Sequence, residues 1–287
     1  MKTILTGLCF SILWASASIA GKFGLRSVEP LVLFNIRFLA AGIILLIISN
    51  TVRKERAPLG IEWRHLTIFG FFNTTLYLGI FIISLQYITA GITALAIALN
   101  PMLISMMASI VMKRKTSMFE WLGIILGMCG VAVAAYPLLA DEQISLIGLG
   151  LLVLCMIAYS YGAVYYSSVK WELARMAING WQVFIGGLLL LPFTFLFFEG
   201  KNNFDPNFWA SLFWLVIPVS ILSVQLWLRL LKADAVKASL WLFLCPVFGI
   251  TFSTILLDEP FSLYTIAGGV LVMVALYVGM RGVEKGN

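Results

Sequence analysis

Residues 90–115 read AGITALAIALNPMLISMMASIVMKRK, and residues 235–260 read AVKASLWLFLCPVFGITFSTILLDEP. Each contains an apolar run of about 20 residues, the length that an α-helix needs to cross the hydrocarbon core of a membrane. When the chain is shifted on itself by 145 residues, Pro101 falls on Pro246, and the basic KRK end of the first segment falls on the acidic DEP end of the second. The two segments therefore read as one element used twice, with its ends on opposite faces of a membrane.

Composition extends this reading to the whole chain. Of its 287 residues, 61% are hydrophobic and 11% are charged, whereas soluble domains carry about 25% charged residues. A soluble globule of this size lacks the polar surface to cover so much apolar area, so a cytosolic enzyme, a secreted disulfide scaffold and a disordered chain are excluded. The four cysteines lie in apolar runs and the chain has one histidine. We therefore expect no disulfide framework, no metal centre and no other cofactor. Apolar runs of spanning length lie at roughly 3–21, 30–49, 66–86, 90–112, 119–138, 146–166, 177–198, 208–228, 235–257 and 261–280.

The basic residues orient these ten spans. Nearly all of the 19 Lys and Arg residues fall on the side that holds both termini, and the other side has Lys22, Arg26 and Lys201. Cytoplasmic loops of membrane proteins are enriched in Lys and Arg. We therefore expect a multi-pass protein that lies in the lipid bilayer of the cell inner (plasma) membrane with both termini in the cytoplasm. The same asymmetry accounts for the net charge of +6, so no nucleic-acid partner is expected.

The repeat divides the chain into two units, residues 1–138 and residues 139–287. The 145-residue shift also places Gly123 on Gly268. Each unit holds five spans, and because five is odd the second unit enters the membrane from the opposite side. Inverted repeats of this kind are typical of secondary transporters. The sequence thus predicts an all-α integral membrane fold of ten transmembrane helices, arranged as two five-helix inverted repeats.

Glycines in the fifth and tenth spans indicate close helix packing. Gly123 and Gly127 have the GxxxG spacing that lets two helices approach closely, and Gly268 and Gly269 lie at the equivalent place in the second unit. We expect these glycines to serve packing within the fold. A homodimer interface is the other possibility.

Four segments resemble the drug/metabolite transporter superfamily of the EamA type: LWAS at 13–16, NIRFL at 35–39, LQYITAG at 85–91 and LDEP at 257–260. Arg114 departs from the resemblance, because that family usually has Glu there. The resemblance covers essentially the whole chain, and it implies ten helices around a central cavity, alternating access and a small organic substrate. It does not imply which substrate, since the family includes transporters of amino acids, sugars, nucleotide-related molecules and drugs.

Arg37 is the one charged residue deep inside a span, about 10 Å from the outer face if its helix begins near Pro30. An arginine at such a depth must face the bundle interior or water. It either captures a carboxylate or phosphate of the substrate or is satisfied by helix-end carbonyls, and we favour the structural interpretation. No Asp or Glu lies at mid-span. This disfavours a proton relay and favours facilitated diffusion or substrate exchange.

Polar residues and prolines at mid-span are further candidates. Asn73 and Tyr77 are spaced i, i+4 and so share a helix face, and Asn100 directly precedes Pro101. A proline inside a helix frees the carbonyl four residues earlier. Pro101 and Pro246 therefore mark paired weak points in the fourth and ninth spans, which act either as gates or as packing kinks.

Aromatic residues complete the candidate site. Trp14, Tyr159 and Trp241 offer faces on which a flat or cationic substrate would stack, although packing is the commoner role of any single ring. The predicted substrate-binding residues are Trp14, Arg37, Asn73, Tyr77, Asn100, Tyr159, Gln225, Ser239 and Trp241.

These features favour transport over other membrane functions. A membrane enzyme needs paired carboxylates, a nucleophile with its base, or metal ligands, and an ATP-driven pump needs a GxxxxGK[ST] motif. The spans contain neither such a catalytic set nor this nucleotide-binding motif. A receptor or scaffold would not need the repeat. We expect a non-enzymatic secondary transporter of small organic metabolites, amino acids or similar, that works without a membrane carboxylate. The family resemblance implies alternating access and favours efflux. The alternative is an exporter of cationic drugs or quaternary ammonium compounds.

Overall fold

The computed structural model describes residues 2–84, 87, 90–136, 145–257 and 262–281. The first half of the chain forms α1 (Lys2–Gly24), α2 (Pro30–Ile47), the π-helical segment η1 (Ile48–Val52), α3 (Ile61–Gly70), the π-helical segment η2 (Phe71–Leu76), α4 (Tyr77–Ser84), α5 (Ala90–Val111) and α6 (Met118–Ala135). The second half forms α7 (Leu146–Ser168), α8 (Arg175–Leu196), α9 (Pro206–Trp214), the π-helical segment η4 (Leu215–Ser223), α10 (Val224–Ala233), α11 (Ala235–Leu240), the 3₁₀ turn η5 (Trp241–Phe243), α12 (Leu244–Leu257) and α13 (Leu263–Arg281).

The predicted all-α membrane class is confirmed. Over the described ranges, nine helices are long and apolar enough to cross a membrane. The remaining predicted span corresponds to α5, in which Ala96–Val111 forms a shorter apolar helix. Helices that are apolar over this length are stable with lipid around them, because water solvates long apolar surfaces poorly.

Two of the spans become π-helical in their middle. α3, η2 and α4 form one continuous helix with a π-helical middle, and α9, η4 and α10 form another. A shift of 145 residues carries η2 to residues 216–221, which lie inside η4. π-helical turns are rare and occur frequently at functional sites. The two segments are therefore matched irregularities of the two halves.

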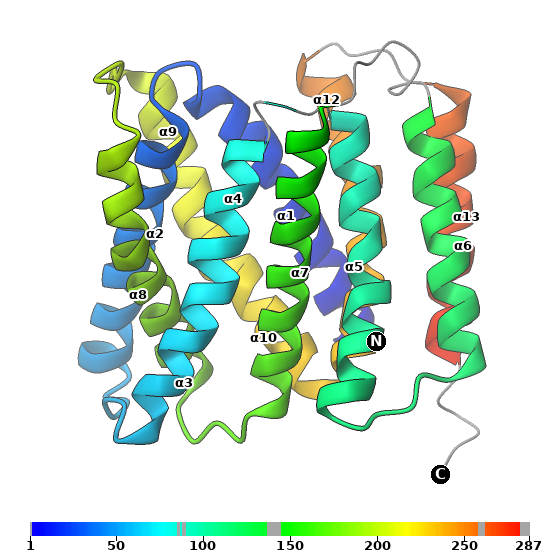
Figure 1. The fold of residues 1–287 in the computed structure, drawn as a ribbon, viewed down its shortest axis with the longest axis horizontal. Coiled ribbons are helices and arrows are strands. Elements are labelled where there is room, and N and C mark those ends of the chain that lie inside the picture. Colours follow the sequence, from blue (N-terminus) through cyan, green and yellow to red (C-terminus); the bar gives the residue numbers. More distant parts are fainter. Residues whose placement is uncertain (1, 85–86, 88–89, 137–144, 258–261, 282–287) are drawn as a thin grey trace.

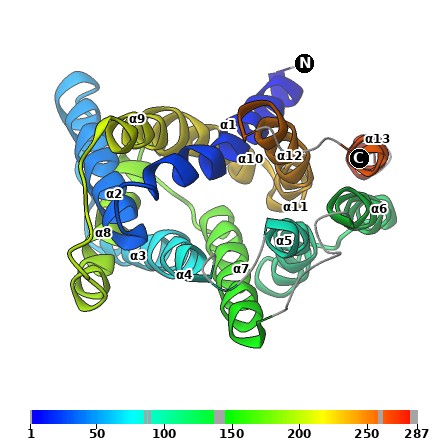
Figure 2. The same ribbon diagram turned by 90° about the horizontal axis from the view of Figure 1, so that it is seen from above.

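The helices form two rows, with a tightly packed pair at each end (Figures 1 and 2). α2 packs on α8 at one end of the molecule, and α6 packs on α13 at the other. In between, α1 packs on η4, α10 and α12, while α7 packs on η2, α4 and α5. The neighbours of α1 thus come from the second half of the chain, whereas α7 packs mainly on the first half and also contacts α10.

Contacts at the α2–α8 end are reciprocal. A Cβ atom on Gly42 would lie 2.6 Å from the Phe184 Cβ, and one on Gly187 would lie 3.1 Å from the Leu39 Cδ2. The 145-residue shift carries Gly42 onto Gly187 and Leu39 onto Phe184, so it exchanges the two contacts. Surfaces related by a two-fold axis meet in this way, which supports the predicted inverted repeat.

The α6–α13 end follows the same rule. Gly123 lies against Gly279, and Gly268 lies against Ala134, again a pair of contacts that the shift exchanges. A Cβ on Gly123 would stand 2.7 Å from the Gly279 Cα, so the glycines let the two backbones touch. The expectation that these glycines pack within the fold is confirmed.

Short polar side chains mark where several helices begin. The side chains of Ser117, Ser145, Asp205 and Asp234 each accept a hydrogen bond from the backbone N–H three residues later. Such N-caps satisfy donors that have no partner within the helix. They fix the starts of α6, α7, α9 and α11 at the edges of the apolar layer.

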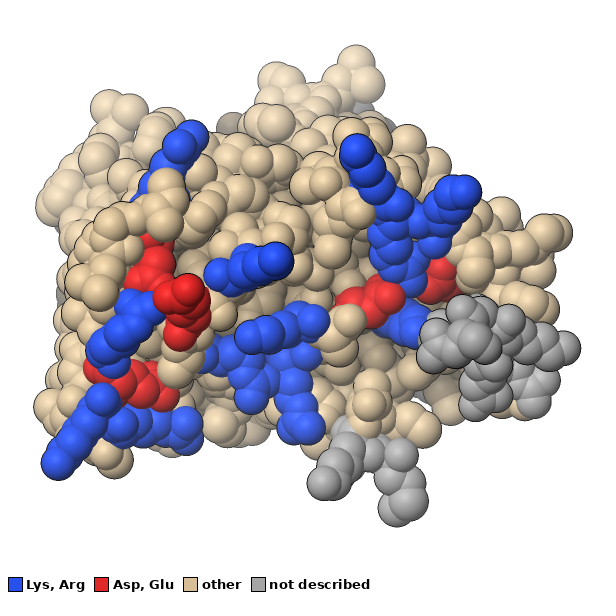
Figure 3. Space-filling view, turned by 90° about the horizontal axis from the view of Figure 1, so that it is seen from below, with Lys and Arg blue, Asp and Glu red and all other residues tan. Residues whose placement is uncertain are grey.

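One end of the bundle carries many Lys and Arg side chains, with a few Asp and Glu among them (Figure 3). We call it the basic face. It contains the loops at 53–60, 112–117 and 169–174, where α3 and α6 begin and α5 and α7 end. This is the side that the sequence places in the cytoplasm, and its orientation in a membrane stays a prediction.

Candidate functional site

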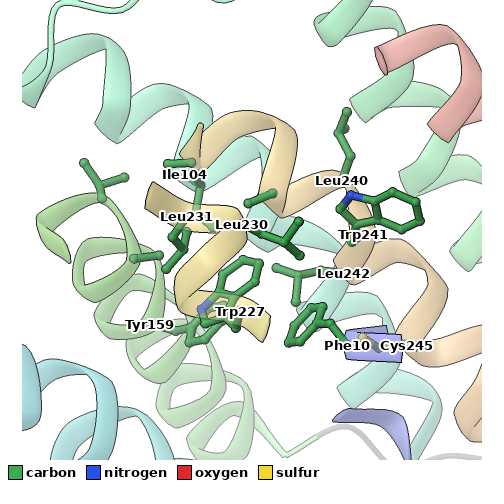
Figure 4. Packing of buried hydrophobic residues seen from close by; sticks show 14 of the residues in the cluster. Phe10, Ile104, Tyr159, Trp227, Leu230, Leu231, Leu240, Trp241, Leu242 and Cys245 are labelled. Atoms are coloured by element: carbon green, nitrogen blue, oxygen red, sulfur yellow. The ribbon is translucent and has the colours of Figure 1, made fainter. Parts of the chain in front are cut away.

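A column of aromatic rings lies at the centre of the fold, where α1, α4, α7 and α10 meet. Phe10 stacks on Trp227 with ring centroids 4.8 Å apart, and Trp227 stacks on Tyr159 at 5.9 Å. Tyr77 lies 4.5 Å from Tyr159, and Trp14 lies 5.8 Å from Phe10. Figure 4 shows the rings of Phe10, Trp227 and Tyr159 close together. Because the rings come from both halves of the chain, this aromatic column is an interface between them.

Two donors in the aromatic column have no protein partner among the residues that the structure describes. Tyr159 is 1% exposed and Trp227 is 2% exposed, yet neither the Tyr159 hydroxyl nor the Trp227 indole N–H makes a hydrogen bond to protein there. Leaving such a group unpaired costs about 1–3 kcal/mol. Buried donors of this kind mark a place for a ligand acceptor or an ordered water. The interface between the halves therefore holds aromatic rings and two unpaired donors side by side.

Asn100 lies beside the column. Its amide Nδ2 donates to the Met156 Sδ at 3.1 Å, and its Oδ1 accepts from the Ser160 hydroxyl at 3.1 Å. Ser160 follows Tyr159 on α7, and Asn100 precedes Pro101 on α5. The amide thus fixes the proline-containing part of α5 to the helix that carries one of the column's tyrosines.

The two prolines have different surroundings. Pro101 lies inside the continuous helix α5, whereas Pro246 follows the 3₁₀ turn that separates α11 from α12. The Ser11 hydroxyl on α1 lies 2.9 Å from the carbonyl oxygen of Trp241 in that turn. A backbone acceptor near Pro246 is therefore bound by α1. The gating role of either proline stays a prediction.

Buried polar side chains connect the π-helical segments to the opposite half. Arg37 on α2 donates from Nε to the Ser220 hydroxyl in η4 at 2.8 Å. Gln182 on α8 accepts from the Thr74 hydroxyl at 2.9 Å and from the Asn73 amide at 3.3 Å, both in η2. The 145-residue shift carries Arg37 onto Gln182. Each half therefore sends the same helix position to the π-helical segment of the other.

The surroundings of Arg37 explain how a cation is held at this depth. Arg37 is 3% exposed, and its guanidinium lies 5.1 Å from the Phe34 ring centroid and 5.5 Å from that of Phe38. No carboxylate in the described part of the chain pairs with it. Aromatic faces and one hydrogen bond stabilise the charge. This environment fits a link between the halves better than a place in the aromatic column.

Besides Arg37 and Asn73, three more predicted site residues lie away from the aromatic column. Gln225 donates to a backbone carbonyl at the start of α8 at 3.2 Å. Ser239 donates to a backbone carbonyl within α11, and Trp241 is buried against Gly7 of α1. Of the predicted set, the residues in or beside the column are Trp14, Tyr77, Asn100 and Tyr159.

Sequence reasoning missed Phe10, Trp227 and Ser220. Phe10 lies four residues before Trp14, one helical turn along the same face. Ser220 and Trp227 are seven residues apart and therefore also share a face of their span. These spacings are the signals that would have added both rings to the candidate site.

A groove of about 680 Å³ lies on the other side of α1, between α9 and α12. Ile12, Ser16 and Phe23 line it from α1. Their spacing places them on one face of the helix, whereas Phe10 and Trp14 share a different face. α1 therefore separates this largely apolar groove from the aromatic column.

Comparisons with known proteins bear on the whole chain. The profile of the EamA-like transporter family matches residues 1–136 and 146–280. The uncharacterized transporter YoaV of Bacillus subtilis is 23% identical over 97% of this chain and 96% of its own length. A probable amino-acid metabolite efflux pump of Salmonella typhimurium is 23% identical over 94% of this chain and 92% of its own length. One solved crystal structure has a TM-score of 0.82 at 15% identity, with 98% of each chain covered, a likeness that shows the fold alone.

Proposed function

Because this chain belongs to the EamA-like transporter family, we propose that it is a secondary transporter that carries a small organic molecule across a membrane by alternating access. The family resemblance predicted from the sequence is confirmed by the same match. The observation that carries the proposal is the aromatic column with its two buried, unpartnered donors. A substrate held there contacts both halves, so relative movement of the halves exposes it first to one side and then to the other.

The chemistry of the column favours an amino acid or a similar metabolite with an apolar or aromatic part. Tyr159 and Trp227 each present one donor, which suits a carboxylate or carbonyl oxygen, and Phe10 adds a stacking face. The Salmonella relative is named as a probable amino-acid metabolite efflux pump, which supports this substrate class and export. A cationic drug would use the same rings by cation–π contact, but it would leave both donors without an acceptor.

The positions of the acidic residues favour transport without a proton relay. In the described spans, Glu62 and Glu120 lie in the first turns of α3 and α6, at the membrane edge. Proton relays inside membranes use Asp, Glu or His. The proposed mechanism is therefore facilitated diffusion or substrate exchange. The proposed location is the cell inner membrane, with the basic face and both termini in the cytoplasm. The proposed moving units are residues 1–138 and 139–287.

A ligand screen followed by flux measurements tests the proposal. Purified protein is heated in detergent with single amino acids, their derivatives and quaternary ammonium compounds, because a true ligand raises the apparent melting temperature by mass action. Each ligand is then tested for counterflow into liposomes preloaded with the unlabelled compound, without a proton gradient. Accumulation of labelled amino acid is the expected result. Uptake only with a proton gradient would contradict the mechanism, ligands only among the quaternary ammonium compounds would favour the alternative, and absence of flux would indicate a scaffold.

A pair of tryptophan variants links the flux to the column. Trp227→Phe keeps a stacking ring and removes one donor, so we expect weaker substrate binding. Trp181→Phe is the matched control, since the Trp181 indole N–H is also buried without a partner among the described residues but stacks edge-on against Trp63 at 4.7 Å. Equal effects of the two variants on binding would contradict the placement of the substrate in the column.

A further inference from the structure

Arg114 joins the two halves of the chain on the basic face. Its Nη1 and Nη2 donate to the Glu120 carboxylate at 3.1 and 2.5 Å, and its Nε and Nη2 donate to the Asp234 carboxylate at 3.1 and 2.8 Å. Glu120 is 1% exposed, and charge-assisted hydrogen bonds are about twice as strong as neutral ones. Glu120 belongs to the first half and Asp234 to the second. One side chain therefore holds the two halves together.

Both carboxylates also cap helices. Glu120 accepts from the Ser117 backbone N–H in the capping box that begins α6, and Asp234 accepts from the Lys237 backbone N–H at the start of α11. Arg114 thus ties the first turn of α6 to the first turn of α11. Burial lowers the pKa of Arg114, but its bonds to Glu120 and Asp234 outweigh burial and raise that pKa above its usual value. The guanidinium therefore stays charged.

The triad of Arg114, Glu120 and Asp234 lies over a closely packed part of the interface between the two halves. α11 packs on α5, and Ile104 and Ala108 of α5, with Leu231 and Leu240 of the second half, are fully buried. Figure 4 shows Ile104, Leu231 and Leu240 near the aromatic column. Along α5, Asn100 lies beside the column, and Ile104 and Ala108 occupy successive turns toward the basic face. These aliphatic side chains separate the column from that face.

The opposite face has no equivalent triad in its sequence. The residues 145 positions away from Arg114, Glu120 and Asp234 are Glu259, Thr265 and Thr89. This set contains one carboxylate and no cation, so it cannot form the same ion pairs. The equivalent of Ile104 is Gly249, where an added Cβ would meet no atom of the described residues within 4 Å. The two ends of the interface therefore differ in the side chains that are available to join the halves.

We propose that Arg114 is a positioning residue of the transport cycle: it latches the two halves on the basic face, and the aromatic column opens to that face only when the Arg114–Asp234 contact breaks. The inference rests on the proposed function and on the cytoplasmic location of the basic face. In an exporter, release of this latch is the step that admits substrate from the cytoplasm. The latch sets how often the substrate-free protein is open to that side.

Cys245 provides the reporter for a test. It is 5% exposed and lies next to Phe10 at the column (Figure 4). With the other three cysteines replaced by serine, a charged, membrane-impermeant maleimide reaches Cys245 only through an open pathway. Labelling is followed from the cytoplasmic side in inverted membrane vesicles and from the other side in intact cells. We expect Arg114→Gln to raise the labelling rate from the cytoplasmic side about tenfold, which corresponds to ~1.4 kcal/mol.

Two isosteric variants separate the latch from helix capping. Glu120→Gln and Asp234→Asn keep the cap acceptors, because Gln serves in a capping box and Asn is as good an N-cap as Asp, but they remove the charge. Both are expected to raise cytoplasmic labelling, and Arg114→Lys, which keeps the cation, is expected to restore part of the protection. Arg56→Gln is the matched control, because it removes an exposed ion pair with Glu62 on the same face, and we expect it to leave labelling unchanged.

Unchanged labelling of Cys245 in folded Arg114→Gln and Asp234→Asn proteins would overturn the latch. If Arg114→Gln does not fold, Asp234→Asn decides alone, because its helix cap is retained. The labelling needs no substrate, so its result is independent of flux. A protein that shows the expected labelling and carries nothing in liposomes contradicts the proposed function and leaves the latch standing.

Discussion

Replacing Tyr159 by phenylalanine is expected to stabilise the substrate-free protein and to weaken substrate binding. The Tyr159 hydroxyl is buried and has no protein partner among the described residues, and an unpaired buried donor costs about 1–3 kcal/mol. Phenylalanine removes that cost and keeps the ring against Trp227 and Tyr77. At about 2–4 °C per kcal/mol, the melting temperature should rise by a few degrees. A hydrogen bond to a charged acceptor contributes about 1.5 kcal/mol, so the substrate affinity should fall about tenfold.

Tyr166→Phe is the matched control for this variant. Tyr166 is also 1% exposed and its hydroxyl also has no partner in the described structure. Its ring lies beside Phe69 and Trp171 instead of in the column. We therefore expect the same rise in melting temperature and no change in affinity. The difference in affinity between the two variants isolates the contribution of the column hydroxyl to substrate binding.

Thermal unfolding in detergent, with and without a ligand from the screen, measures both effects in one experiment. The melting temperature without ligand reports the stability of the resting protein, and its rise with ligand concentration reports affinity. A lower melting temperature for Tyr159→Phe with unchanged affinity would mean that the hydroxyl serves the fold and does not meet substrate. That result would refute the assignment of the column as the substrate site.

Three further predictions use the same assays. Gly123→Ala, which places a methyl group against the backbone of α13, should lower the free energy of unfolding by about 1–3 kcal/mol, whereas Gly150→Ala, which meets open space, should raise it by about 0.4–1 kcal/mol. Arg37→Gln installs the residue found at the equivalent position of the second half, so melting temperature and flux should stay close to wild type; a loss of affinity at unchanged melting temperature would instead identify Arg37 as a substrate ligand. The hydrogen bond from the Phe208 backbone N–H lowers the pKa of Asp205. The ionised Asp205 carboxylate therefore contributes its full stability above the unfolded pKa of about 3.9, and this contribution is lost as pH falls through the lower folded pKa. Asp205→Asn, which keeps a cap acceptor, should make the melting temperature less sensitive to acid over about pH 5 to 2.

The spans were predictable because a membrane helix must be apolar along its whole length. The run at 146–166 corresponds to α7, which begins at Leu146. The run at 66–86 misses the first turn of its helix, since α3 begins at Ile61 and carries Glu62 there. Charged residues at the membrane edge lower the local hydropathy while the backbone is already helical. Hydropathy therefore locates the apolar layer and not the ends of the helices.

The π-helical segments and the composition of the aromatic column could not be predicted in the same way. Hydropathy is insensitive to whether a backbone N–H binds the carbonyl four or five residues earlier, and Pro218 within η4 was the one local signal. On a helix that is apolar all round, a ring that faces lipid and a ring that faces the interior look alike. Trp227 and Phe10 were missed for that reason. Arg37 and Gln182 were not recognised as a pair because their side chains differ although their roles match.

The contacts between the halves differ in whether the 145-residue shift reproduces them. The contacts of Gly123 and Gly268 are reciprocal. A protein that opens to the other side by exchanging the conformations of its two halves therefore keeps both contacts. Their energies are then the same in the two open states and do not favour either one. The Arg114–Asp234 contact has no counterpart in the sequence of the other face. Its whole energy therefore adds to the free-energy difference between the state open to the basic face and the state open to the opposite face. We therefore expect Gly123→Ala to lower the melting temperature without changing the side from which Cys245 is labelled. We expect Arg114→Gln to change that side with a smaller effect on the melting temperature, and labelling of both variants from the same side would show that the reciprocal contacts also take part in opening.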